Sequence, residues 1–97
     1  MENPLNFIKQ NDEELFEHIG KSREMAFKDG TIPAKYKYLI ALAVDAVSRT
    51  ESGVKSLAEM ARQNGATKNE IMETLRITNL IGGLVSTYTA ACGLKDL

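Results

Sequence analysis

Cysteine and histidine, the residues that most often carry redox chemistry or bind transition metals, are nearly absent from this sequence. Its 97 residues include one cysteine, Cys92, and one histidine, His18. A single cysteine cannot form a disulfide within the chain, and zinc sites built from cysteine and histidine need four ligands. The composition therefore excludes an internal disulfide and the zinc-finger class, and we expect neither a metal nor a cofactor.

Long hydrophobic runs and clustered basic charge are also missing. No segment approaches the roughly 18 uninterrupted apolar residues of a membrane span, and the start MENPLNFIKQ lacks the pattern of a secretory leader. Twelve basic and 13 acidic residues leave a net charge of -1. Nucleic acid and acidic membranes both require a basic cluster. We therefore expect a cytoplasmic protein that binds neither of them.

Proline and glycine are too sparse for a β-protein. Two prolines and seven glycines cannot supply a turn every 8 to 12 residues, as an all-β domain requires. The apolar share of 43% and the charged share of 26% lie in the globular range. We therefore expect one all-α domain, residues 1–97, of about five helices.

Apolar residues recur every three or four positions in segments bounded by capping residues and glycines. Three pairs, Asn11 with Glu14, Ser48 with Glu51 and Thr67 with Glu70, have the spacing of a capping box. Glycine stops are expected at Gly30, Gly65 and Gly93, and a break at the glycine pair 82–83. The pattern predicts helices over 12–29, 33–47, from 48 to the stop at 65, from 67 to the glycine pair, and 84–92.

The helix over 33–47 is apolar on nearly every side from residue 36 onward. Such a pattern is typical of an element that is buried on most of its faces. A 97-residue chain has little surface with which to cover it and the apolar last segment. We therefore expect the chain to form a homo-oligomer.

Asp45 is the one carboxylate within the apolar stretch 39–47, where an unpaired charge is costly. Two interpretations remain open. Arg49, one helical turn later, offers an intrahelical ion pair. Alternatively, Asp45 projects into a pocket, where its carboxyl could transfer protons.

The other reactive side chains favour structural roles. His18 lies among carboxylates on a surface helix, which is typical of a solvated side chain. Cys92 falls near the end of a helix, whose carbonyl end does not stabilise a thiolate. We interpret Cys92 as a packing residue.

The middle and end of the chain resemble the carboxymuconolactone decarboxylase and alkyl-hydroperoxidase-D-like family over about residues 30–93. The segments that carry the resemblance are IPAKYKYLIALAVDAVS, LAEMARQNGATKNEIMETLRI and NLIGGLVSTYTAA. The resemblance implies an all-helical domain that assembles as trimers or hexamers. It also implies an active pocket near the start of the third helix, at a subunit boundary.

The catalytic residues of that family have no counterpart in this chain. In the redox branch, the pocket looks like a glutamate in the core helix, a C-x-x-C pair and a histidine four residues later. By resemblance these positions fall on Tyr38, Thr50, Gly53 and Leu57. The decarboxylase branch uses a histidine at or near Leu57. The resemblance thus implies a peroxiredoxin-like scaffold without the redox dithiol, and we assign no catalytic residue.

We therefore expect a helical oligomer that binds a small apolar or carboxylated ligand or serves a structural role. Its candidate pocket residues are Tyr38, Leu42, Asp45, Thr50, Gly53 and Leu57. One alternative is an active peroxidase or lactone decarboxylase that uses Asp45 with Tyr38 or Tyr88. A second is a helical adaptor that binds a partner protein through an exposed apolar groove.

Overall fold

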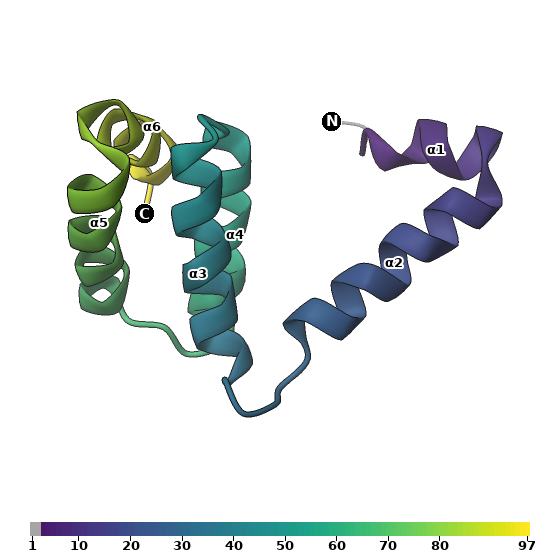
Figure 1. Ribbon diagram of the computed structural model, residues 1–97, viewed down its shortest axis with the longest axis horizontal. Helices are drawn as coiled ribbons and strands as arrows, with labels where there is room; N and C mark the ends of the chain where they lie inside the picture. The colour runs from purple at the N-terminus through teal and green to yellow at the C-terminus, as the bar shows by residue number, and fades with distance from the viewer. Residues whose placement is uncertain (1–2) are drawn as a thin grey trace.

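The computed structural model describes residues 3–97, and all regular structure within that range is helical, which confirms the expected all-α class. Figure 1 shows a body formed by the last four helices and an arm formed by the first two. The helices are α1 (Leu5–Asn11), α2 (Glu13–Phe27), α3 (Ala34–Val47), α4 (Glu51–Gln63), α5 (Lys68–Gly82) and α6 (Leu84–Leu94). None of them combines the length and apolarity that crossing a bilayer requires.

The core of the body is built from small and branched apolar side chains of α3 to α6. Leu42, Val54 and Ile71 are its largest fully buried side chains, and alanines fill the space between them. Gly93 lets α6 lie close against α4, because a Cβ atom there would stand 2.8 Å from the Glu51 carbonyl oxygen and from Val54. The close helix contact therefore depends on a residue without a side chain.

Several predicted helix ends are confirmed. Thr67 accepts a hydrogen bond from the Glu70 backbone N–H at 3.0 Å, and the Glu70 side chain accepts one from the Thr67 N–H at 2.8 Å. The expected capping box is therefore present. Gly65 and Gly83 take φ values of 96° and 87°, which favour glycine, and α5 ends at the predicted glycine pair.

The helix ends at 48–50 differ from the prediction because Ser48 closes α3 instead of opening α4. Arg49 takes a left-handed φ of 61°. The N–H of Thr50 donates to the Asp45 carbonyl at 2.9 Å, and that of Arg49 donates to Ala46 at 3.1 Å. This is the Schellman arrangement, with arginine where glycine is usual. The predicted Ser48–Glu51 capping box was therefore wrong, and Thr50 precedes α4.

Three other predicted boundaries were also wrong. Asp12, not Asn11, caps α2 by accepting from the Leu15 N–H at 3.0 Å, because residues up to Asn11 form the unpredicted helix α1. Gly30 does not take a left-handed conformation. Gly93 lies inside α6, which ends one residue later, because its role is the close contact with α4.

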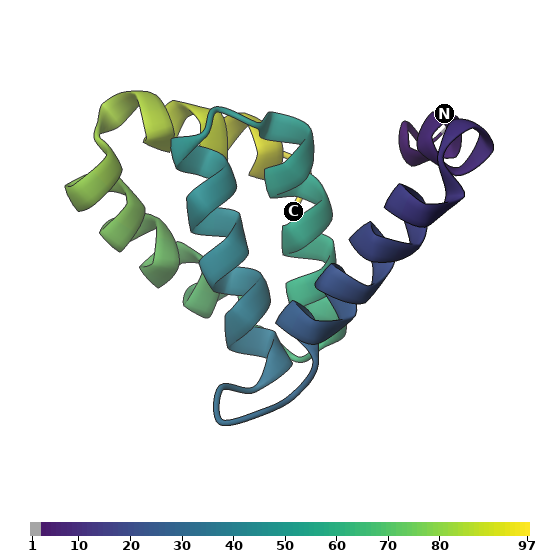
Figure 2. The ribbon, with the colours of Figure 1, turned by 45° about the vertical axis from the view of Figure 1, so that its right-hand side comes forward.

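The arm of α1 and α2 stands away from the body. Figures 1 and 2 both show α2 meeting α3 only near the foot of the arm and diverging from it above. There, the rings of Phe27 and Tyr38 stack with centroids 4.5 Å apart. Neither α1 nor α2 has a buried residue. The radius of gyration is 14.3 Å, against about 12.5 Å for a compact chain of this length.

The start of α5 is tied to α3 by an ion pair that should make stability depend on pH. Lys35 Nζ lies 3.1 Å from Glu70 Oε2. The hydrogen bond from the Thr67 backbone, followed by that from Lys35, holds the pKa of Glu70 below its ordinary value of 4.5. A carboxyl whose pKa is lowered by folding stabilises the protein above its unfolded pKa, and this stabilisation is lost as the pH falls through the folded pKa.

We therefore expect Glu70→Gln to be less stable than the wild type at pH 7, with the difference shrinking toward pH 3. Denaturant unfolding at both pH values measures this. Glu73→Gln, at an exposed site on the same helix, is the control and should show no such trend. An equal deficit of Glu70→Gln at both pH values would contradict the assignment.

Candidate functional site

A cleft of about 430 Å³ lies between α2, α3 and the first turns of α4. We call it the Asp45 cleft. Its volume is within the range of small-molecule sites, which is about 300 to 1,000 Å³. Most of its lining is apolar, with Arg23, Asp45 and Ser56 as the polar exceptions. The lining residues are Arg23, Phe27, Ala41, Val44, Asp45, Gly53, Ser56 and Leu57.

Three of the six predicted pocket residues, Asp45, Gly53 and Leu57, meet in this cleft. The reversal of the chain at 48–50 brings the end of α3 beside the start of α4. The Asp45 carboxylate then lies against Gly53, where a Cβ atom would overlap with it. Glycine thus admits the carboxylate to the first turn of α4, where the helix dipole stabilises negative charge.

Tyr38 lies in an adjoining cleft of about 450 Å³ lined by Gly20, Arg23, Glu24, Phe27, Lys28 and Tyr38. Arg23 and Phe27 line both clefts, so the two clefts are neighbours along α2. Because its ring stacks on Phe27, Tyr38 forms part of the wall between α2 and α3.

Leu42 and Thr50 do not line the Asp45 cleft. Leu42 has no exposed surface, because it faces the core of the body between α3 and its neighbours. Thr50 is exposed ahead of α4, and its hydroxyl donates to the Ser48 carbonyl at 3.5 Å. Neither of these two predicted residues is therefore part of the Asp45 cleft.

Of the two interpretations of Asp45, the structure fits the pocket. Arg49 falls beyond the end of α3, so the i,i+4 geometry of an intrahelical pair does not exist. Within residues 3–97 the one ion pair joins Lys35 and Glu70. The basic residue of the cleft is Arg23, which sequence reasoning missed, although its place on the apolar stripe of α2 between Phe16 and Phe27 could have indicated it.

The side chains best suited to nucleophilic or redox chemistry lie elsewhere. Cys92 is exposed on α6, and His18 lines a separate surface cleft on α2 together with Asp12, Glu14, Glu17 and Lys21. Tyr88, predicted as an alternative partner of Asp45, is exposed on α6 and does not line the Asp45 cleft. Residues 3–97 contain no group of three potential metal ligands. The cleft can therefore hold an apolar body while Arg23 binds an anionic group.

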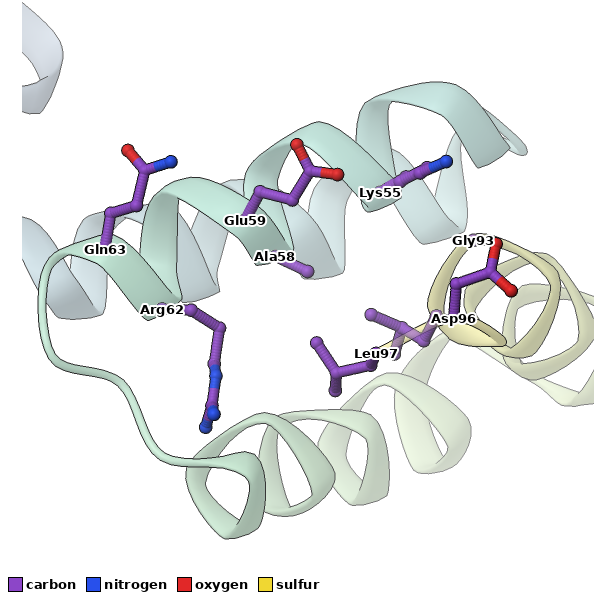
Figure 3. A pocket seen from close by; sticks show the side chains of 9 residues that line it. Lys55, Ala58, Glu59, Arg62, Gln63, Gly93, Asp96 and Leu97 are labelled. Atoms are coloured by element: carbon purple, nitrogen blue, oxygen red, sulfur yellow. The ribbon is translucent and has the colours of Figure 1, made fainter.

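A second candidate, of about 320 Å³, lies between α4 and the end of the chain. Figure 3 shows Arg62 and Leu97 directed into it, while Glu59 and Gln63 point away. Arg62 Nη1 donates to the Ala66 carbonyl at 3.4 Å. Because this hydrogen bond spans the α4–α5 turn, the arginine already has a structural role, and we favour the Asp45 cleft.

Comparison with known proteins identifies a family and a similar solved structure. The model of the carboxymuconolactone decarboxylase family matches residues 13–92. The crystal structure of the apo form of a carboxymuconolactone decarboxylase family protein from Legionella pneumophila superposes with a TM-score of 0.87 at 27% sequence identity. The match covers 94% of this chain and 81% of that one. No curated protein sequence matches the chain.

Proposed function

Because this chain belongs to the carboxymuconolactone decarboxylase family, we propose that it is a homo-oligomer that binds a small ligand in the Asp45 cleft and performs no dithiol chemistry. One observation carries the proposal. The cleft includes Gly53 and Leu57, which by resemblance take the place of a catalytic cysteine and histidine, and its walls are apolar with one arginine. The Asp45 cleft thus offers groups that can bind a ligand, whereas the thiol of Cys92 lies on another helix, α6.

The ligand class follows from the polar residues of the cleft. The Arg23 guanidinium pairs well with a carboxylate, while Phe27 and Leu57 favour an apolar body. Asp45 repels a second carboxylate and accepts hydrogen bonds from a hydroxyl group. A small apolar monocarboxylate is therefore the best fit.

Self-association is supported by a large apolar surface over α3, α5 and α6, which we call the apolar patch. Val47 lies next to Gly82, which joins the α3 and α5 parts of the patch. Further along, residues of both helices line one groove. The patch consists of Ile40, Val44, Val47, Ile77, Leu80, Ile81, Leu84, Val85 and Tyr88, each more than half exposed.

The exposed area of the chain supports the same proposal. The chain exposes 7093 Å², about 1,600 Å² more than the roughly 5,500 Å² expected for a folded monomer of 10.7 kDa. A standard interface removes about 800 Å² from each partner. The excess thus equals the area that two such interfaces would bury on one subunit.

Titration with benzoate, followed by backbone NMR shifts, tests ligand binding in the cleft. We expect shifts at Ala41, Gly53 and Leu57, and about tenfold weaker binding in Arg23→Gln, since a charge-assisted hydrogen bond contributes roughly 1.4 kcal/mol or more. Benzyl alcohol, which lacks the carboxylate, should bind more weakly than benzoate.

Arg76→Gln is the matched control, because Arg76 is exposed on α5 and does not line the cleft. It should bind benzoate as the wild type does. Shifts confined to other surfaces, or equal affinity of the wild type and Arg23→Gln, would overturn the proposed site.

A further inference from the structure

The two charged residues of the Asp45 cleft, Arg23 and Asp45, have opposite charges but do not pair with each other. Within residues 3–97 the one ion pair joins Lys35 and Glu70, so no side chain there neutralises either charge of the cleft. The third polar residue of the lining, Ser56, is uncharged. The cleft therefore offers one unpaired cation and one unpaired anion to the molecule that fills it.

Gly53 fixes the position of the anion. A Cβ atom on this residue would overlap with the Asp45 carboxylate, so the first turn of α4 has room for the carboxylate only because the residue is glycine. The dipole of α4 favours a negative charge at this point. Asp45 is half-buried, whereas Arg23 on α2 is exposed. The anion is thus the more enclosed of the two charges, and the cation is the more accessible.

The rest of the lining is apolar and comes from Phe27, Ala41, Val44 and Leu57 beside the backbone of Gly53. These side chains can hold an apolar body, but they offer no hydrogen bond to a charged group. Covering a half-buried carboxylate is costly unless a hydrogen-bonded cation replaces the water. A ligand with a carboxylate alone pairs with the arginine and leaves this cost uncompensated.

The adjoining cleft does not supply the missing partners. Its other two charged residues, Glu24 and Lys28, do not line the Asp45 cleft. Neither takes part in an ion pair within the part of the chain that the structure describes. The charges that complement the Asp45 cleft are therefore left for a ligand to supply.

We propose that the ligand of the Asp45 cleft is an amino carboxylate, in which a short apolar spacer separates a carboxylate from a protonated amine. The carboxylate pairs with Arg23, the amine donates hydrogen bonds to Asp45, and the spacer packs against Phe27 and Leu57. This inference rests on the proposed function, because it requires that Arg23 binds a ligand carboxylate. It adds Asp45 as the residue that determines specificity.

Three benzoates of nearly equal size test the inference on the wild-type protein. They carry a methyl, a hydroxymethyl or an aminomethyl group in the para position, and calorimetric titration at neutral pH measures their affinities. The aminomethyl compound should bind about tenfold more tightly than the methyl compound, because it adds a charge-assisted hydrogen bond. The hydroxymethyl compound should fall between them, since a neutral hydroxyl forms a weaker hydrogen bond. An aminomethyl compound that binds no more tightly than either of the others would overturn the inference.

Substitution of Asp45 tests whether this side chain causes the preference. Asp45→Asn keeps the size of the residue but removes its charge, so the affinity ratio of the aminomethyl and methyl compounds should fall from about ten to near one. Gly53→Ala, which displaces the carboxylate, should lower the ratio as well. Asp96→Asn is the matched control and should keep the wild-type ratio, because Asp96 is exposed and lies outside the cleft. A wild-type ratio in Asp45→Asn would overturn the role of Asp45.

Arg23→Gln separates this inference from the proposed function. It should weaken the binding of all three compounds, because each of them carries the carboxylate. If none of the three binds to the wild type, the proposed function fails and the inference fails with it. If the methyl compound binds through Arg23 and the aminomethyl group adds no affinity, only the inference fails.

Discussion

A glutamate in place of Val44 should break the contacts made through the apolar patch and lower the mass of the assembly. Val44 is 59% exposed on α3 and lies in the groove between α3 and α5. Burying an unpaired carboxylate there costs several kcal/mol, which exceeds what a single interface residue normally contributes. Because the side chain is exposed in the single subunit, the fold should persist.

Light scattering measures the mass of the assembly, and circular dichroism measures whether the fold persists. Met72→Glu is the control, because Met72 is 47% exposed on α5 but does not belong to the patch. It should leave the mass unchanged. A wild type that is already a monomer would contradict self-association and favour the adaptor alternative, in which the patch binds a different protein.

Alanine in place of Leu42 should lower the free energy of unfolding by roughly 2 to 5 kcal/mol, the range for leucine truncation in a rigid core. Leu42 is fully buried among α3, α4 and their neighbours. The surrounding helices meet through alanines and glycines, which cannot move far to fill the space. A loss of this size is a large part of the total stability of a small domain.

Denaturant unfolding at fixed protein concentration measures the change, and Met72→Ala serves as the exposed control with an expected effect below about 1 kcal/mol. Leu42→Ala should still bind benzoate at temperatures where it is folded, because Leu42 does not line the cleft. A small loss of stability together with lost benzoate binding would instead indicate that Leu42 is a pocket residue.

The helices were predictable wherever local sequence determines them. Thr67 and Glu70 cap α5 through contacts within one turn, and the glycine pair ends it, so the pattern alone sufficed. The Schellman turn at Arg49 was not predictable, because arginine rarely takes a positive φ and the usual glycine signal is absent. Because no glycine marks the end of α3, the sequence pattern predicted Ser48 at the start of the following helix.

The candidate site was predictable only in part, for a related reason. Asp45, Gly53 and Leu57 come from adjacent helices, so the family resemblance could bring them together, and they line one cleft. Leu42 shares α3 with Asp45 but faces the core, and a helix that is apolar on nearly all sides gives no periodic signal to separate the two faces. Arg23 reaches the cleft from α2, and this long-range contact depends on the stacking of Phe27 on Tyr38.

The central claim is that the family scaffold here serves binding and not thiol chemistry. A dithiol cycle needs two sulfurs on residues whose Cα atoms are about 4.4 to 6.8 Å apart. This sequence has one cysteine, Cys92, which lies outside the Asp45 cleft.

The most direct test is the consumption of an organic hydroperoxide with a dithiol donor, compared between the wild type and Cys92→Ser. We expect equal rates, no higher than that of the free donor. Turnover far above that level in the wild type, lost in Cys92→Ser, would contradict the account and assign the protein to the peroxidase branch of its family.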